Sequence, residues 1–422
     1  MNERLDTLAE CRHCGLLQSL PEVPHGALSA CSRCDATLHQ SARHALALSL
    51  ACSGLGVFLF ALAFWLPVAN VTMRGGRSAT SDLFTGPERL RQAGAWELAV
   101  VVVVTLLVLP GFELVSILAM SFGVWLRNVP LWVRRCFAAL PALSSWAMVE
   151  VFMLGATISL VRLRAWMHVE FGSALFALGG VALCSIGVTS AVDRRALWAR
   201  VPLTPARASQ ERQPRVMSCG GCELVGQFEE GAPCPRCSRT LHERKPHSLR
   251  RTSALVLTAT MLAVPANVLP VMTIIRAGVG GPSTILGGTI ELVQNGFWLL
   301  AALVFTASIV VPVVKLIALC TLLISTWRAA PGRLGLRTKV FRAVSFIGRW
   351  SMLDIFATMT LVELARFGWL GSVRPGTGAI AFCAVVVLTM LASESFDPRL
   401  MWDAAGENGA PVPQARSDWR LA

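Results

Sequence analysis

The stretch Trp350-Ser-Met-Leu-Asp-Ile-Phe356 repeats Trp146-Ala-Met-Val-Glu-Val-Phe152 at an offset of 204 residues. Three more pairs share nearly the same offset: Cys31-Ser-Arg-Cys34 with Cys234-Pro-Arg-Cys237, Leu109-Pro110 with Val311-Pro312, and Asp193-Arg-Arg-Ala-Leu-Trp198 with Asp397-Pro-Arg-Leu-Met-Trp402. A nearly constant offset between such landmarks indicates two tandem copies of one unit. Each copy holds an even number of long apolar segments, so the copies are predicted to share one orientation, as a parallel repeat.

Long apolar segments make up most of each copy. The chain is 54% hydrophobic and only 15% charged, whereas about a quarter of the residues in a soluble domain are charged. A run of about 20 apolar residues spans the hydrocarbon of a bilayer, and backbone groups inside lipid require helices. We therefore expect eight helical spans, at residues 46–69, 95–124, 136–161, 172–192, 253–274, 297–325, 341–365 and 378–396.

The distribution of lysine and arginine predicts the orientation of these spans. Basic residues concentrate in the loops 127–135 and 328–342 and in the linker 193–252, which lie on one side if there are eight spans. The opposite side is less basic, although residues 74–91 hold four arginines and blunt the contrast. The positive-inside rule places both termini and the linker in the cytoplasm. The net charge of +13 is then explained by cytoplasmic loops, and nucleic-acid binding is not expected.

These patterns predict an all-α polytopic membrane protein. It would contain two tandem four-helix transmembrane modules, each preceded by a small cytoplasmic zinc-ribbon domain of rubredoxin-like type. The expected boundaries are ribbon 1 at 1–45, module 1 at 46–195, a basic linker at 196–215, ribbon 2 at 216–250, module 2 at 251–402 and a disordered tail at 403–422.

Two pairs of CxxC motifs predict two metal sites. The first set is Cys11, Cys14, Cys31 and Cys34, and the second is Cys219, Cys222, Cys234 and Cys237. Paired CxxC knuckles bring four thiolates together tetrahedrally, and Zn²⁺ favours such a closed site. A rubredoxin-like iron is the alternative, while disulfides are disfavoured in a reducing cytoplasm. A closed Cys₄ site has no open coordination position, so a structural role is expected.

Ionisable and hydroxyl side chains inside the spans form the second set of candidate residues. They are Glu113 and Glu150 in the first copy, and Lys315, Asp354, Ser308, Ser351 and Thr389 in the second. Charges inside a membrane are costly, and they mark either function or tight pairing. Lys315 and Asp354 have opposite signs and are candidates for an intramembrane ion pair. One interpretation is a charge or proton relay, or the polar floor of a substrate cavity. The other is a structural salt bridge between helices.

Motifs for enzymatic chemistry do not occur in the sequence. A Walker A motif, a GxGxxG fingerprint after a strand, HExxH and GxSxG are all lacking. We therefore expect a protein that is not an enzyme. Energy from ATP hydrolysis would have to come from another protein.

The combination of paired CxxC ribbons, four helices after each and the Trp-x-Met-x-acidic-x-Phe element resembles the paraquat-inducible protein A family of Gram-negative inner membranes. The resemblance covers about residues 10–402, and both ribbons retain all four cysteines. It implies a multi-pass protein of the bacterial inner membrane whose partner is a periplasmic hexameric MCE-domain protein that forms a tunnel. It also implies movement of phospholipids between the two membranes and maintenance of the envelope.

Three functions remain open at this point. The first is a subunit that passes phospholipid to or from the tunnel, with Lys315 and Asp354 coupling ion movement to that step. The second is a redox- or metal-sensing membrane protein that uses the ribbons. The third is a passive membrane anchor for the tunnel.

Overall fold

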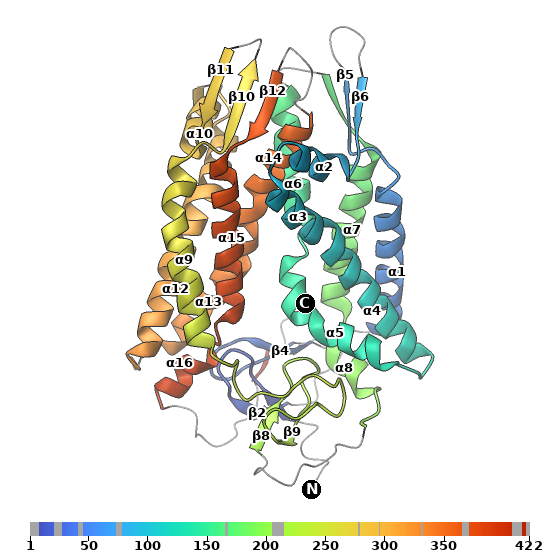
Figure 1. The fold of residues 1–422 in the computed structure, drawn as a ribbon. Coiled ribbons are helices and arrows are strands. Elements are labelled where there is room, and N and C mark those ends of the chain that lie inside the picture. Colours follow the sequence, from blue (N-terminus) through green and yellow to red (C-terminus); the bar gives the residue numbers. More distant parts are fainter. Residues whose placement is uncertain are drawn as a thin grey trace.

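The computed structural model is a helical bundle with small β-structures at both ends (Figure 1). It describes residues 8–20, 28–40, 45–72, 78–164, 168–204, 215–276, 279–294, 296–330, 332–364, 371–406 and 416–418. One end of the bundle carries two three-stranded sheets, and the opposite end carries the strands of the cysteine-containing segments.

The helices follow one another in the same order in the two halves of the chain. In the first half they are α1 (Ala45–Ala63), α2 (Thr85–Gln92), α3 (Trp96–Val102), the π-helix η1 (Val103–Val108), α4 (Leu109–Trp125), α5 (Leu131–Leu143), the 3₁₀-helix η2 (Ser144–Trp146), α6 (Val149–Arg164), α7 (Ser173–Ala191) and α8 (Arg194–Ala199). In the second half they are α9 (Ser248–Val268), α10 (Ile285–Gln294), α11 (Trp298–Phe305), the π-helix η3 (Thr306–Val310), α12 (Val311–Trp327), α13 (Leu334–Ile347), the 3₁₀-helix η4 (Gly348–Met352), α14 (Leu353–Leu364), α15 (Thr377–Ser395) and α16 (Arg399–Ala404).

The repeated sequence landmarks coincide with irregularities in these helices. Pro110 and Pro312 each stand at the second residue of a helix that follows a π-helical segment, η1 or η3. Because proline lacks an N–H, the preceding turn loses a hydrogen bond and widens. The Trp-x-Met-x-acidic-x-Phe element lies where a long apolar segment breaks into two helices, at η2 and η4. The sequence predicts single continuous spans at 136–161 and 341–365, and the structure replaces each by two helices.

Six of the described helical segments are long and apolar enough to cross a membrane. They are Ala45–Ala63, Trp96–Trp125, Leu131–Val161, Ser173–Ser190, Trp298–Trp327 and Thr377–Ser395. The two other predicted spans, 253–274 and 341–365, are helical as α9 and α13–α14 but do not meet the same criteria of length and composition. The protein is therefore a multi-pass membrane protein with six candidate spanning helices, and the arrangement in two four-helix modules stays a prediction.

The two halves pack against each other through α6 and α14. Within each half, the first and last long helices are neighbours, since α1 packs on α7 and α9 packs on α15. Gly155 of α6 lies so close to α14 that a Cβ placed there would be 3.0 Å from the Leu353 carbonyl oxygen. Four residues along α6, the Ser159 hydroxyl donates to the Ala357 carbonyl oxygen at 2.9 Å. This close helix contact is the central seam of the bundle.

The two antiparallel sheets at the end away from the cysteines were not foreseen from the sequence. One has the order β6-β5-β7, from β5 (Ala69–Thr72), β6 (Ser78–Ser81) and β7 (His168–Phe171). The other has the order β11-β10-β12, from β10 (Met272–Arg276), β11 (Val279–Ser283) and β12 (Gly371–Pro375). Each sheet joins a hairpin to the strand that precedes the last long helix of its half, so the repeat extends to this end of the molecule (Figure 1).

Parts of the predicted linker and tail are folded. Residues 196–199 of the linker belong to α8, where Trp198 is buried. Residues 403 and 404 close α16, and β13 (Arg416–Asp418) pairs with β3 (Leu28–Ala30) of the first cysteine-containing segment. The expectation of a disordered tail at 403–422 is therefore wrong for these described positions, because β3 supplies unpaired backbone groups to which the tail can hydrogen-bond.

Candidate metal centres and polar groups of the bundle

The eight predicted metal ligands form two compact clusters. In the first, the Sγ atoms of Cys11 and Cys34 are 3.4 Å apart and those of Cys14 and Cys31 are 3.6 Å apart. In the second, the Cys219–Cys237 and Cys222–Cys234 separations are 3.5 and 3.4 Å. All eight side chains are buried, and the four Sγ atoms of each cluster lie within 4.8 Å of one another.

Four knuckles of identical backbone geometry create these clusters. In each, the residue after the second cysteine has a left-handed conformation: Gly15 (φ +73°), Asp35 (φ 60°), Glu223 (φ 59°) and Ser238 (φ 61°). Its N–H donates to the carbonyl of the first cysteine, at 2.9 to 3.0 Å. Only the first of these four positions is a glycine, and the other knuckles adopt the same conformation with residues that carry side chains.

Short strands support the knuckles. In the first segment they are β1 (Leu8–Glu10), β2 (Leu17–Ser19), β3 and β4 (Thr37–Gln40), and in the second they are β8 (Arg215–Ser218) and β9 (Val225–Phe228). The pairs β1-β2, β3-β4 and β8-β9 are antiparallel hairpins that each enclose a knuckle. The fourth knuckle is closed by a bridge between Pro233 and Thr240.

The donor set fits a tetrahedral metal ion. Thiolates at about 2.3 Å from zinc are about 3.8 Å from one another in a tetrahedron, and the four Sγ separations given above lie just below that value. They are far longer than the roughly 2 Å of a disulfide, and all eight cysteines are free. The Nε2 atom of Gln18 donates to the Cys31 Sγ at 3.1 Å, while Gln18 Oε1 accepts from the backbone N–H of Ser32. Donors of this kind stabilise a thiolate ligand.

A charged network docks the two clusters on each other and on the helices. Glu10, beside the first cluster, accepts from the Ser218 hydroxyl at 2.5 Å and from Arg399 Nη1 at 3.0 Å. Arg399 also forms a two-pronged ion pair with the buried Asp397 at 3.0 Å. Burial raises the pKa of Asp397, but the hydrogen bond and charge of Arg399, together with the backbone N–H groups of Lys245 and Arg399, hold the pKa below its ordinary value.

A second carboxylate bridges the two clusters. Glu223 contacts Arg12 of the first knuckle at 2.7 Å and Arg195 of α8 at 3.3 Å. Burial alone raises its pKa, but the charges of Arg12 and Arg195 hold the pKa below its ordinary value. The repeated Asp-x-x-x-x-Trp elements thus join the membrane bundle to the cysteine segments, since Asp193 caps α8 and Asp397 anchors Arg399, the first residue of α16.

Lys315 is buried in α12, with 3% of its surface exposed. A Cβ placed on Gly348 would be 2.6 Å from its Nζ, so the ammonium lies directly against η4. The carboxylate that acts on it electrostatically is Glu394 of α15. The ion pairs of the described residues do not include one between Lys315 and Asp354.

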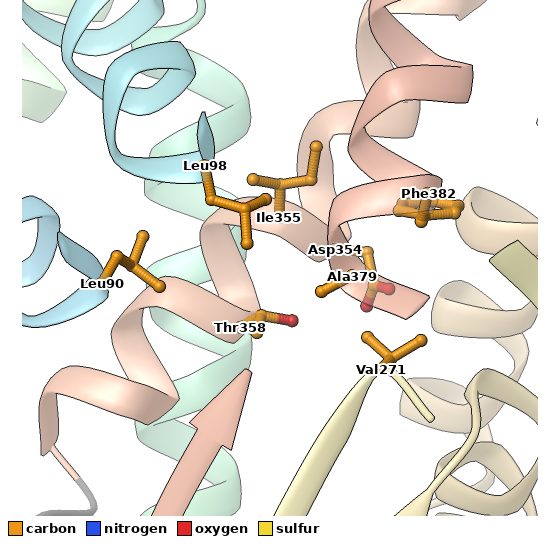
Figure 2. A pocket seen from close by; sticks show the side chains of 8 residues that line it. All are labelled: Leu90, Leu98, Val271, Asp354, Ile355, Thr358, Ala379 and Phe382. Atoms are coloured by element: carbon orange, nitrogen blue, oxygen red, sulfur yellow. The ribbon is translucent and has the colours of Figure 1, made fainter. Parts of the chain in front are cut away.

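Asp354 lies in a different part of the bundle interior from Lys315. Together with Thr358 it lines a small cavity whose other walls are apolar side chains from both halves of the chain (Figure 2). Leu90 and Leu98 come from the first half, and Val271 and Phe382 from the second. Asp354 therefore sits at the contact between the halves, on the side that leads toward the strand-bearing end.

The three predicted hydroxyl residues are buried near these charges. Ser351 donates to the Gly348 carbonyl oxygen at 2.6 Å, and Thr389 donates to the Val386 carbonyl oxygen at 2.9 Å. Ser308 lies in the π-helix η3, and its buried Oγ has no hydrogen-bond partner among the described residues. A hydroxyl without a partner in such a place is available to a mobile proton, water or ligand.

Glu113 and Glu150 line a second, larger cavity of about 250 Å³ with Arg349. Glu113 belongs to α4, Glu150 begins α6, and Arg349 reaches in from η4 of the other half. Ser144, Ser145 and Thr189 add hydroxyl groups to its wall. The two predicted acidic residues of the first half are thus brought together, at the break that carries the repeated Trp element.

Sequence reasoning missed Glu394 and Arg349. Glu394 accepts a hydrogen bond from the Ser145 hydroxyl, so it connects Lys315 of the second half to the larger cavity of the first. A signal existed for Glu394, because it lies inside the predicted span 378–396. The same signal existed for Arg349, which lies inside the predicted span 341–365 and directly precedes the repeated Trp350.

These features define a class: a multi-pass membrane protein with an internal repeat, two buried Cys₄ clusters at one end and charged groups inside the bundle. The sequence profile of the family described as paraquat-inducible protein A matches residues 43–202 and 249–406. The chain belongs to this family. The two matched segments begin and end close to the two helical halves, which confirms the tandem repeat.

Curated relatives match along almost the whole chain. Intermembrane transport protein PqiA of Escherichia coli K12 is 33% identical over 94% of this chain and 96% of its own length. Lipophilic envelope-spanning tunnel protein A of the same organism is 29% identical over 93% and 91%. A probable intermembrane transport protein of Haemophilus influenzae is 25% identical over 94% and 95%. No solved structure is significantly similar to the chain.

Proposed function

We propose that this protein is an inner-membrane subunit of an intermembrane lipid transport system. It would pass phospholipid to or from a periplasmic tunnel formed by a hexameric MCE-domain protein and thereby maintain the envelope. The names of the relatives support transport between membranes. The observation that carries the proposal is the group of ionisable side chains at the seam between the two halves. Lys315 is buried and interacts electrostatically with Glu394, whose carboxylate accepts a hydrogen bond from Ser145. Ser145 in turn lines the cavity that also holds Glu113, Glu150 and Arg349.

The proposed topology has eight spans, in two four-helix modules, with α9 and α13–α14 added to the six helices found. Both termini and both cysteine clusters would lie in the cytoplasm, and the two three-stranded sheets in the periplasm. The sheets would then face the tunnel protein. The basic loops on the cluster side support this orientation.

Each cysteine cluster would hold one structural Zn²⁺, with iron as the alternative. Its role would be to fold the ribbon and fix it on the bundle through Glu10, Glu223 and Arg399, because ribbons of this size bury little core. Transport itself would require no enzymatic step by this chain. Lys315, Asp354, Ser308, Ser351 and Thr389 would move a proton or ion in step with lipid.

Affinity purification from membranes in mild detergent tests the proposal. An MCE-domain protein and phospholipid in the eluate, identified by mass spectrometry, would support it. Recovery of the intact protein with neither partner nor phospholipid would remove its basis. Iron in place of zinc together with that result would favour the redox-sensing alternative.

A further inference from the structure

The cavity at the break between α5 and α6 has an unusual charge pattern for the interior of a bundle. Glu113 and Glu150 contribute negative charge and Arg349 contributes positive charge around a volume of about 250 Å³. The three come from three different elements, α4, α6 and η4. The cavity is therefore assembled only when the two halves of the chain are packed together.

These charges line the cavity without pairing directly. Among the described residues no ion pair joins Arg349 to Glu113 or Glu150. The buried Nε of Arg349 also has no hydrogen-bond partner in that part of the chain. The Arg349 guanidinium instead lies over the Phe346 ring, 5.3 Å from its centroid, and interacts with Glu113 without direct contact. Charges inside a protein that lack a hydrogen-bonded counter-ion are costly. A ligand that carries both an anionic and a cationic group would compensate all three.

One wall of the cavity is formed by residues that are also exposed on the outside of the bundle, where lipid would lie. Ile186 and Thr189 of α7 line it, and both are exposed on the outer surface of the helix. Thr189 is two residues from the end of α7 that faces the cysteine clusters. A lipid in the leaflet on the cluster side could insert its headgroup here while its acyl chains stay along α7.

We propose that this cavity binds the headgroup of a phospholipid that carries both a phosphate and a primary ammonium. Arg349 binds the phosphate, because a guanidinium matches phosphate oxygens with two parallel N–H donors. Glu113 and Glu150 accept hydrogen bonds from the ammonium, and Ser144, Ser145 and Thr189 add polar contacts. This inference rests on the proposed function, since it names the lipid class that the transport system selects.

The arrangement predicts discrimination between headgroups. A phosphatidylglycerol headgroup supplies the phosphate but no cation, so both carboxylates would stay uncompensated. A phosphatidylcholine headgroup supplies a cation without N–H donors, so the carboxylates would lose hydrogen bonds. Loss of a hydrogen bond to a charged group weakens binding by about tenfold or more.

Binding of short-chain phosphatidylethanolamine, phosphatidylglycerol and phosphatidylcholine to the purified full-length protein in detergent, followed by native mass spectrometry, tests the site. We expect phosphatidylethanolamine to bind about tenfold more tightly than phosphatidylglycerol. The double variant Glu113→Gln/Glu150→Gln should lose this preference but still bind phospholipid. Arg349→Gln should weaken binding of all three lipids, and Arg349→Lys should restore part of it.

Glu363→Gln is the matched control, because Glu363 is a bundle carboxylate that accepts from Ser81 at the far end of α14. The control should keep the wild-type preference.

Equal binding of the three lipids by the wild type, or the same preference in the double variant, would overturn the headgroup site while leaving lipid transport standing. If the wild type binds no phospholipid at all, the proposed function fails together with the site. If Arg349→Gln does not fold, the double variant and Arg349→Lys decide the question.

Discussion

Phe152 and Phe356 hold the same position in the two copies of the repeat, and their rings pack edge to face with centroids 5.7 Å apart and planes at 86°. Both side chains are fully buried. Equivalent residues meet in this way only near the axis that relates the two halves. The repeated seven-residue element thus lies both at the contact between the two halves and at the helix breaks beside the cavities.

Gly155 is the tightest point of this seam, and Gly155→Ala should destabilise the bundle. The added Cβ would be 3.0 Å from the Leu353 carbonyl oxygen and 3.2 Å from the Ala357 backbone nitrogen. Neither backbone atom can move without shifting α14, so we expect a loss of about 1–3 kcal/mol. The thermal inactivation midpoint of the purified protein should fall by several degrees.

Gly179→Ala is the control for this experiment. Its added Cβ would meet only the Met153 Cε, at 3.6 Å, which is an ordinary contact. The helix propensity gain from glycine to alanine is the same at both sites. Equal midpoints for the two variants would mean that α6 and α14 are not in close contact.

The sequence predicted those parts of the fold that depend on local periodicity and composition. Both ends of α7 and α15 lie within one residue of the predicted spans, α1 begins where predicted but ends six residues earlier, and the CxxC spacing located all four knuckles. It missed the two three-stranded sheets, because strands such as β5 and β7 pair across almost 100 residues of chain. It also missed the electrostatic interaction between Lys315 and Glu394, since which charges come near each other depends on how α12 and α15 are rotated against each other.

Metal content gives a second prediction. The wild type should contain about two zinc ions per chain, and Cys14→Ser should reduce this to about one. The remaining ion would stay with the second cluster, whose four cysteines form a separate set. Elemental analysis of the purified proteins measures both values. Retention of two ions by Cys14→Ser would show that Cys14 is not a ligand.

Gln18 should tune the affinity of the first cluster. It donates to the Cys31 Sγ and accepts from Ser32, so Gln18→Ala removes the support of one ligand. Loss of such outer contacts typically lowers metal affinity about 10–100-fold. Competition with a chromophoric chelator would measure this. Gln227→Ala, at an exposed position of β9 in the second segment, serves as the control and should leave both sites unchanged.

The eight-span prediction can be tested at α9. A reporter fused after Arg276 should lie in the periplasm and one fused after Arg328 in the cytoplasm if α9 spans the membrane. Alkaline phosphatase and a fluorescent protein report these two compartments. Cytoplasmic location of the Arg276 fusion would mean that α9 does not cross, and the eight-span prediction would have to be abandoned.

Lys315 and Glu394 offer a test of whether the buried charges serve transport or only stability. Glu394 is the carboxylate that acts electrostatically on the buried Lys315, so removing either charge takes away a favourable interaction inside the bundle. Lys315→Met and Glu394→Gln should therefore each lower the thermal midpoint, and the double variant should recover much of the loss. Methionine at position 315 is unbranched and of nearly the same length as lysine, so it keeps the packing against Gly348.

Lipid flux in the double variant then separates the two interpretations. A charge relay requires Lys315 itself, so the double variant should be stable but inactive in a lipid transfer assay between labelled vesicles. A structural salt bridge requires only that no charge is left alone, so the stable double variant would transfer lipid at the wild-type rate. Lys315→Arg adds a check, because it keeps the positive charge but holds its protons at neutral pH. Full activity in that variant would exclude proton transfer at position 315 and leave charge compensation as its role.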